Sequence, residues 1–202
     1  MKVLIYSLNF SPELTATGKY TGELGAWLSK QGHEVCAIAG MPHYPQWSLF
    51  DDYVPARYMQ EQKDGVNILR VPHFIPKKSK VSASNRIKME LSFSRQSFRY
   101  WSKILTSKSK YDVVILVCPP LFTSIYPMWY KLFRGVPWVL QVQDIQVDVA
   151  VDLGLIKNRW LIKSLYFLEK RILRSAAIVS TIFSKMCKRP SLACFNAFTK
   201  IS

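Results

Sequence analysis

Acidic residues, cysteines and glycine motifs are all scarce in this sequence, and each scarcity narrows the class of protein. Only 13 aspartates and glutamates stand against 28 lysines and arginines, and the net charge of +15 favours an anionic partner. The four cysteines show no C-x-x-C spacing, so we expect buried thiols in a reducing compartment and no metal site. The first glycine-containing loop has neither G-x-G-x-x-G nor G-x-x-x-x-G-K-[ST], which excludes the common phosphate-loop patterns.

The sequence also lacks an uninterrupted apolar run long enough to cross a membrane. Residues 113–130 are 18 uncharged residues, the lower limit of such a span. Three prolines divide this stretch, so we predict a strand over 112–118 and a helix over 121–133, with proline tolerated at the helix start. We expect no signal peptide, because a strand follows Lys2 directly, without a small-residue cleavage site.

The first forty residues have the pattern of a strand, a loop, a helix and a second strand. An apolar run over 3–8 is followed by a polar loop over 9–19 and by a second apolar run over 33–39. Between them, the spacing of four large residues predicts a helix that buries one face: Tyr20, Leu24, Trp27 and Leu28. Gly32 fits the end of this helix. Such a βαβ unit with apolar strands predicts a parallel sheet.

The rest of the chain continues this alternation. Period-two or apolar runs predict further strands over 65–71, 111–118, 136–144 and 176–182, whereas residues 51–64 are polar and irregular. Helical periodicity is present over 82–107 and 161–172. Six strands with intervening helices predict a doubly wound, Rossmann-like α/β fold with a parallel sheet.

Positive charge is concentrated in residues 74–110, which hold ten lysines and arginines against Glu90 alone. Within the helix over 82–107, four cations share one face: Lys88, Arg95, Arg99 and Lys103. An apolar stripe lies on another face: Ile87, Leu91, Phe98, Trp101 and Leu105. This pattern is typical of a helix in a membrane interface, but an ordinary domain helix with a solvated face explains it as well. A second stripe (Met89, Phe93, Tyr100, Ile104) fits burial between two surfaces. Nucleic-acid binding rests on charge alone, and we expect no such partner.

Candidate site residues are those that follow the carboxyl ends of the strands, where ligands of open α/β sheets bind. Gly18 leaves room for a phosphate to approach backbone N–H groups, or is simply a turn residue before the helix. His43 lies between prolines and fits a shaped loop or a solvated side chain. Asp144 ends a buried strand, and it either contacts substrate or caps the next helix.

The order of these segments resembles the amino-terminal domain of family-4 glycosyltransferases of the GT-B fold, in particular the WcaI-type fucosyltransferases of colanic-acid exopolysaccharide synthesis. The resemblance covers residues 1–188. The motifs that carry it are Tyr6-Ser7-Leu8-Asn9-Phe10-Ser11-Pro12-Glu13, Thr17-Gly18-Lys19-Tyr20, Gly40-Met41-Pro42-His43-Tyr44-Pro45, Cys118-Pro119-Pro120 and Gln143-Asp144-Ile145-Gln146.

The resemblance implies an enzyme that transfers a sugar from a nucleotide donor, such as GDP-fucose, with retention and without an obligatory metal or other cofactor. It implies that Thr17, Gly18 and Lys19 face the donor diphosphate. Acceptor or cleft contacts are implied for Glu13, His43, Tyr44, Pro119, Gln143 and Asp144. The implied acceptor is a lipid-linked glycan, and the implied location is cytoplasmic, peripheral at the inner membrane, where Lys88, Arg95, Arg99 and Lys103 would meet the lipid surface.

The sequence departs from the family pattern in three places. Gln143 replaces the usual His before Asp144, which makes Asp144 only a weak catalytic candidate. No two of the six glutamates have the eight-residue spacing of the donor-binding second domain. Residues 189–202 follow no family pattern, and we expect a disordered tail from a reading frame interrupted near residue 188. The chain would then be an acceptor-side domain that is inactive alone and is completed by a separate carboxyl-terminal domain. The alternative is a non-catalytic α/β domain that binds a membrane or a partner.

Overall fold

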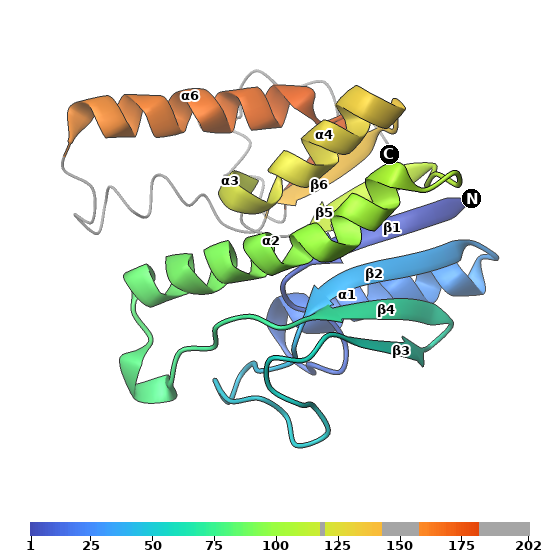
Figure 1. Cartoon of the computed structure of the whole chain (residues 1–202), viewed down its shortest axis with the longest axis horizontal. Coiled ribbons are helices and arrows are strands. Elements are labelled where there is room, and N and C mark those ends of the chain that lie inside the picture. Colours follow the sequence, from blue (N-terminus) through green and yellow to red (C-terminus); the bar gives the residue numbers. More distant parts are fainter. Residues whose placement is uncertain (118–119, 143–157, 182–202) are drawn as a thin grey trace.

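The computed structural model describes residues 1–117, 120–142 and 158–181, in which seven strands form one sheet (Figure 1). The strand order is β3-β4-β2-β1-β5-β6-β7, and only the β3–β4 pair is antiparallel. The strands are β1 (Lys2–Ser7), β2 (Glu34–Gly40), β3 (Met59–Lys63), β4 (Val66–Val71), β5 (Val113–Val117), β6 (Trp138–Val142) and β7 (Ile178–Thr181). The predicted doubly wound α/β fold is confirmed.

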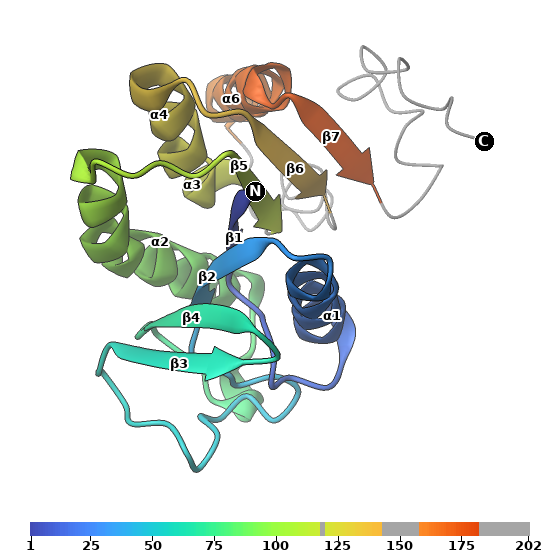
Figure 2. The same ribbon diagram turned by 90° about the vertical axis from the view of Figure 1, so that its right-hand side faces the viewer.

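Helices cover both faces of the sheet, as the two views show (Figures 1 and 2). Helix α1 (Ala16–Lys30) lies on one face, over a core that includes Val3, Ile5 and Ile68. The other face carries α2 (Ala83–Thr106), α3 (Pro120–Thr123), α4 (Ile125–Arg134) and α6 (Arg159–Ser175). A short 3-10 helix, η1 (Lys78–Lys80), precedes α2.

The side chains of β1 alternate between the two faces of the sheet, and their burial on both faces explains why β1 is a central strand. Val3 and Ile5 point into the α1-side core, while Leu4 and Tyr6 point into the core beneath α2, and all four are buried. The chain extends to one side of β1 through β2 and β4, and to the other side through β5 and β6. Ligands of such sheets bind beyond the carboxyl ends of the strands, next to this change of direction.

Two sequence predictions on this side of the molecule are wrong. Residues 51–64 are not wholly irregular, because β3 pairs with β4 at the edge of the sheet. An edge strand is partly exposed and can consist of polar residues, so the apolar pattern that identifies the other strands is absent from β3. The predicted face of α1 is wrong in part: Leu28 packs against the core, but Tyr20 and Trp27 are 61% and 57% exposed. The buried residues are small, namely Gly18, Thr21 and Gly25, so α1 lies close to the sheet.

Helix α2 follows the sequence prediction closely. It begins after Ser82, whose Oγ accepts a hydrogen bond from the Asn85 backbone N–H, and it ends before Ser107. The stripe that contains Met89 and Phe93 is the one buried against the sheet. In the other apolar stripe Trp101 is fully buried, whereas Leu91 and Phe98 are exposed.

The predicted strand and helix over 112–133 are present, although the helix is divided into α3 and α4. No helix in the described ranges is long and apolar enough to cross a membrane.

Candidate functional site

The loops that follow β1 and β2 meet around the buried carboxylate of Glu13, whose side chain is 1% exposed. Its Oε1 accepts hydrogen bonds from the backbone N–H groups of His43 at 2.9 Å and Tyr44 at 3.0 Å. Its Oε2 accepts a third bond, from the Asn9 side-chain amide at 2.9 Å. A buried carboxylate is stable only when it is paired or hydrogen-bonded, and three donors meet this need. The structure therefore brings Glu13, His43 and Tyr44 together, and the acceptor contacts that the resemblance implies for them stay a prediction.

The first turn of α1 completes this group of residues, which we call the Glu13 cluster: Asn9, Glu13, Gly18, His43 and Tyr44. A Cβ atom built on Gly18 would lie 2.5 Å from Oε2 and 2.6 Å from Cβ of Glu13, so no larger residue fits. The glycine therefore makes room for a carboxylate of the chain itself, near the positive end of the helix dipole. Thr17 and Lys19 flank Gly18, and Lys19 is exposed and lies 3.9 Å from Glu23. A role for this turn at a donor diphosphate stays a prediction.

The imidazole ring of His43 lies next to Glu13, and the ring of His73 packs against it with the two centroids 5.1 Å apart. Nδ1 of His43 is 2.9 Å from the Met41 carbonyl oxygen and 3.6 Å from Glu13 Oε1. Because a carbonyl only accepts, this Nδ1 carries the hydrogen. His73, on the segment after β4, has a buried Nε2 without a hydrogen-bond partner among the described residues. Burial, together with the nearby His43, lowers the pKa of His73 to about 3, so this ring is neutral.

Arg70 on β4 is fully buried and bonds to the loop after β1, to the end of β2 and to β3. Its Nη1 donates to the Gly40 carbonyl at 3.1 Å and its Nη2 to the Ser11 carbonyl. Its Nε donates to Glu61 Oε1 on β3 at 2.7 Å, which pairs the buried charge. Sequence reasoning missed Arg70, Glu61 and His73. The sequence contains one signal for Arg70: it is a charged residue within the otherwise uncharged strand over 66–71. An arginine that is buried in a strand needs hydrogen-bond or charge partners.

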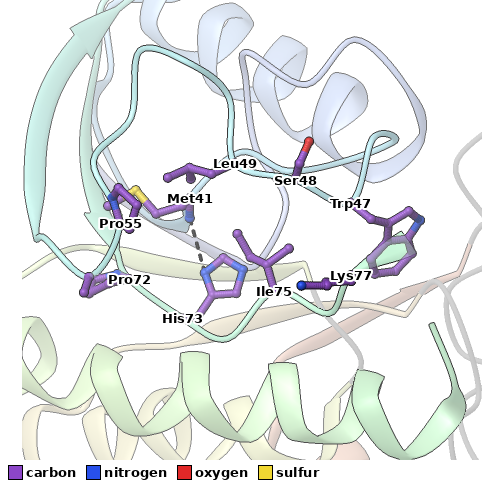
Figure 3. Close-up of a pocket in the computed structure, with 10 residues that line it drawn as sticks. Met41, Trp47, Ser48, Leu49, Pro55, Pro72, His73, Ile75 and Lys77 are labelled. Atoms are coloured by element: carbon purple, nitrogen blue, oxygen red, sulfur yellow. Dashed lines mark hydrogen bonds between the residues drawn. The ribbon is translucent and has the colours of Figure 1, made fainter. Parts of the chain in front are cut away.

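A pocket of about 350 Å³ opens beside this cluster, between the loops after β2 and β4 (Figure 3). Its walls are mostly apolar, and they include Met41, Leu49, Ile75 and the ring of Trp47. His73 forms part of the floor, held by the Met41 backbone N–H at 3.4 Å from its Nδ1 (Figure 3). Among the described residues that line the pocket, Lys77 has the only charged side chain, because His73 is neutral.

The remaining predicted site residues fall into two groups. Pro119, Gln143 and Asp144 lie outside the described residues, so the predicted proximity of Asp144 to Gly18 and His43 stays a prediction. Lys88, Arg95, Arg99 and Lys103 lie on the exposed side of α2, apart from the Glu13 cluster. In the part of the chain that the structure describes, no three His, Cys, Asp or Glu side chains are grouped to hold a metal ion.

Comparison with known families gives a match to the glycosyl transferase 4-like domain over residues 15–187. This range begins just before α1 and includes Gly18 in the first turn of α1 and the segments that carry His43 and His73. The chain belongs to the glycosyl transferase 4-like domain family.

Two known proteins are similar to this glycosyl transferase 4-like domain. WcaI of Escherichia coli (strain K12), which carries the name of a colanic acid biosynthesis glycosyl transferase, is 39% identical over 155 residues. The match covers 77% of this chain and 37% of WcaI, so the chain spans little more than a third of that relative. A solved structure, the catalytic domain of starch synthase IV from Arabidopsis thaliana bound to ADP and acarbose, aligns with a TM-score of 0.49 and 16% identity. This alignment covers 70% of this chain and 34% of that one.

Proposed function

We propose that this chain is the acceptor-side half of a retaining, nucleotide-sugar-dependent glycosyltransferase of exopolysaccharide biosynthesis. The family match over residues 15–187 carries the proposal. It is supported by the likeness to WcaI, whose name refers to colanic acid biosynthesis. The donor is a nucleotide sugar such as GDP-fucose, and the acceptor is a lipid-linked glycan. In this proposal transfer needs no metal, and the paired glutamates that hold the donor belong to a second domain.

In this proposal the Glu13 cluster shapes the acceptor side of the cleft. Its carboxylate is fully engaged by three N–H groups, so it holds the loops after β1 and β2 in one arrangement and does not act as a free base. His43 and Tyr44 are thereby fixed at the carboxyl edge of the sheet, where hydroxyl groups of a sugar would bind.

The test is to combine the chain with a separately expressed carboxyl-terminal half of WcaI and a panel of GDP-, UDP- and dTDP-sugars. We expect transfer to lipid-linked acceptors from the mixture and none from the chain alone, with retained anomeric configuration in the product. A Glu13→Gln variant should lower transfer at least ten-fold, because its amide group opposes one of the three donors, whereas Lys30→Gln at the far end of α1 should not. Absence of transfer from every donor would contradict the proposal, and transfer by the chain alone would contradict its inactivity.

We further propose that the chain lies on the cytoplasmic surface of the inner membrane. Helices α2, α4 and α6 together contain twelve lysines and arginines. Their two acidic residues, Glu90 and Glu169, are both buried, so this helix layer exposes no acid. Large apolar side chains are exposed on the same helices, among them Phe98, Phe133 and Trp160. Cations interleaved with aromatic rings suit an anionic lipid surface.

Flotation with anionic vesicles tests this second proposal. We expect charge reversal of Lys88, Arg95, Arg99 and Lys103 to glutamate to release the protein from vesicles that contain phosphatidylglycerol. A matched variant with Lys2, Lys19, Lys30 and Lys63 reversed has the same net charge but leaves the helix layer intact, and it should still float. Equal flotation of the two variants would contradict a defined membrane face.

A further inference from the structure

Helix α1 covers only half of its face of the sheet. It lies over β1, β2 and β4, and a Cβ atom built on Gly25 would meet Ile5, Phe10 and Val66. Among the described residues, no helix lies on the same face over β5, β6 and β7 (Figure 2). Both faces of a parallel sheet are normally buried, so these three strands lack the cover that such a sheet requires.

The uncovered strands carry a continuous apolar row. Neighbouring strands pair Ile115 with Val139 and Val139 with Ile178, so these three side chains share one face. Ile115 also pairs with Ile5, which is fully buried beneath α1. Along the row, Ile115 and Val139 are half-buried and Ile178 is 43% exposed. Exposure therefore increases from α1 toward β7.

The outer side of α1 is apolar as well. Tyr20 and Trp27 are exposed and lie seven residues apart, on the side opposite Gly18 and Gly25, which face the sheet. Apolar side chains on two opposite sides are typical of a helix enclosed between two surfaces. The outer side of α1 and the uncovered strands are therefore two adjacent apolar surfaces that the described part of the chain leaves open.

Charge distinguishes this face from the opposite one. Helix α1 and strands β5, β6 and β7 contain two lysines and one glutamate (Lys19, Lys30 and Glu23), a sum of +1. Helices α2, α4 and α6 on the other face contain twelve lysines and arginines and expose no acid. Two copies of a chain with a net charge of +15 therefore meet with the least repulsion at the α1 face. Their cationic helix layers then lie on the outer sides, more than about 20 Å apart, which exceeds the Debye length of about 10 Å at 0.1 M salt.

We propose that two copies of this chain form a two-fold dimer in which α1 of each copy covers β5, β6 and β7 of the other. A two-fold axis along the strands places the two α1 helices side by side, in one layer between the two sheets. Each copy supplies one helix and receives one on its adjacent strands, which is the self-complementary surface that a two-fold interface requires. The inference goes beyond the proposed function, because it involves no sugar, lipid or second domain.

The side chains along α1 match the strands that they cover in this dimer. Because α1 connects two parallel strands, it runs antiparallel to them, and Trp27 near its end is level with the amino ends of the strands. Its ring packs on Val139 and Ile178 of the partner subunit. Tyr20 lies two turns earlier, level with Gln141 of the partner subunit, which is two residues beyond Val139 on the same face and gives the tyrosine hydroxyl a polar partner.

Sedimentation equilibrium of the full chain tests the dimer. We expect a monomer–dimer equilibrium with a dissociation constant on the order of 10 µM, because one helix and three short strands form a small interface. The monomer predominates at lower concentrations. A chain that stays monomeric well above this value would overturn the proposal, and would mean that the strands are covered in another way.

Two matched pairs of variants locate the interface. Trp27→Glu should weaken dimerisation at least ten-fold, because a charge enters the apolar contact, whereas Trp160→Glu on α6 should not change it. Ile178→Glu should weaken dimerisation as Trp27→Glu does, whereas Ile125→Glu on α4, where the isoleucine is 42% exposed, should not. Circular dichroism verifies that all four variants are folded. Equal effects of a variant and its control would place the interface elsewhere and overturn the proposal.

Complementary charges test which surfaces meet. Trp27→Lys and Ile178→Glu each place two unpaired charges in their own homodimer. In a mixed dimer one contact joins the introduced lysine to the introduced glutamate, and the other is that of the parent chain. We therefore expect the mixture to dimerise at least ten-fold more tightly than either variant alone. Without this preference, α1 does not lie on β7 of the other copy and the proposed arrangement is wrong.

Discussion

At the scale of single residues, the contact between Gly18 and Glu13 gives the most direct test of the site geometry. A methyl group at position 18 would lie 2.5 Å from Glu13 Oε2, so Gly18→Ala must displace the carboxylate from its three donors. We expect a loss of about 2–4 kcal/mol in the free energy of unfolding, from steric strain and broken bonds to a charged group. Urea denaturation measures it.

A double-mutant cycle shows whether this loss comes from Glu13. The Glu13→Gly variant is itself destabilised, but adding Gly18→Ala to it should cost less than about 1 kcal/mol, because the obstructing side chain is gone. Additive losses in the double variant would mean that Gly18 is required for a reason other than the Glu13 contact.

His73 predicts a pH dependence of stability. In the unfolded chain its pKa is about 6.5, whereas burial lowers it to about 3 in the folded protein. Between these values the unfolded state binds more protons, so the free energy of unfolding falls as the pH falls, by at most about 1.4 kcal/mol per pH unit. A His73→Gln variant should show a flatter decline between pH 6.5 and 4. His33→Gln, immediately before β2, serves as the matched substitution outside the buried cluster.

His43 was predictable as a candidate because it lies in the loop after an apolar strand, and parallel strands bring such loops to one edge of the sheet. Glu13 and Tyr44 were named only through the family resemblance, because no local pattern marks them as part of a site. Arg70 was not predictable as part of the site, because its three partners, Ser11, Gly40 and Glu61, come from three other segments. Local patterns contain no information about such distant hydrogen bonds.

At the scale of elements, α1 and α2 show when periodicity succeeds. In α2 the buried stripe consists of large residues such as Met89 and Phe93, and the cap is a serine, so both the bounds and a buried face follow from the pattern. In α1 the buried face consists of glycine and threonine, which hydrophobicity does not identify. A helix that lies close to a sheet needs small residues at the contact. In α1 this packing requirement, and not the positions of the large residues, determines which face is buried.

The buried face of α1 can be tested by substitution. A Cβ at Gly25 would lie 3.1 Å from Phe10 Cζ and 3.2 Å from Val66 Cγ2, so Gly25→Leu overpacks the core beneath the helix. We expect a destabilisation of about 2–4 kcal/mol from overpacking, measured by thermal and chemical denaturation. Trp27→Leu, on the exposed side, should change stability by less than about 0.5 kcal/mol. The opposite ranking would restore the face that periodicity predicts.

At the scale of the whole molecule, the helix layer of α2, α4 and α6 is held together at its helix ends by its own cations. Lys131 on α4 donates to the Ser175 carbonyl at the end of α6, at 2.6 Å. Arg134 donates to the Leu105 carbonyl near the end of α2, at 3.0 Å. Cations at helix carboxyl ends are stabilised by the helix dipoles. These two bonds connect α4 to both α2 and α6.

This arrangement predicts two separable components of membrane binding. The α4 side chains Leu132 and Phe133 are 74% and 68% exposed, and they flank neither the Glu13 cluster nor the pocket. Insertion of apolar side chains is insensitive to salt, whereas attraction of the α2 cations to anionic lipid weakens as screening increases. We expect Leu132→Ser with Phe133→Ser to leave vesicle binding at low salt largely intact but to abolish the fraction that persists at high salt. Charge reversal on α2 should instead lower vesicle binding at low salt. The vesicle binding that remains in this variant should not change with salt concentration. A salt-resistant fraction that survives the α4 substitutions would assign the apolar contact to another part of the layer, such as Trp160 and Phe167 on α6.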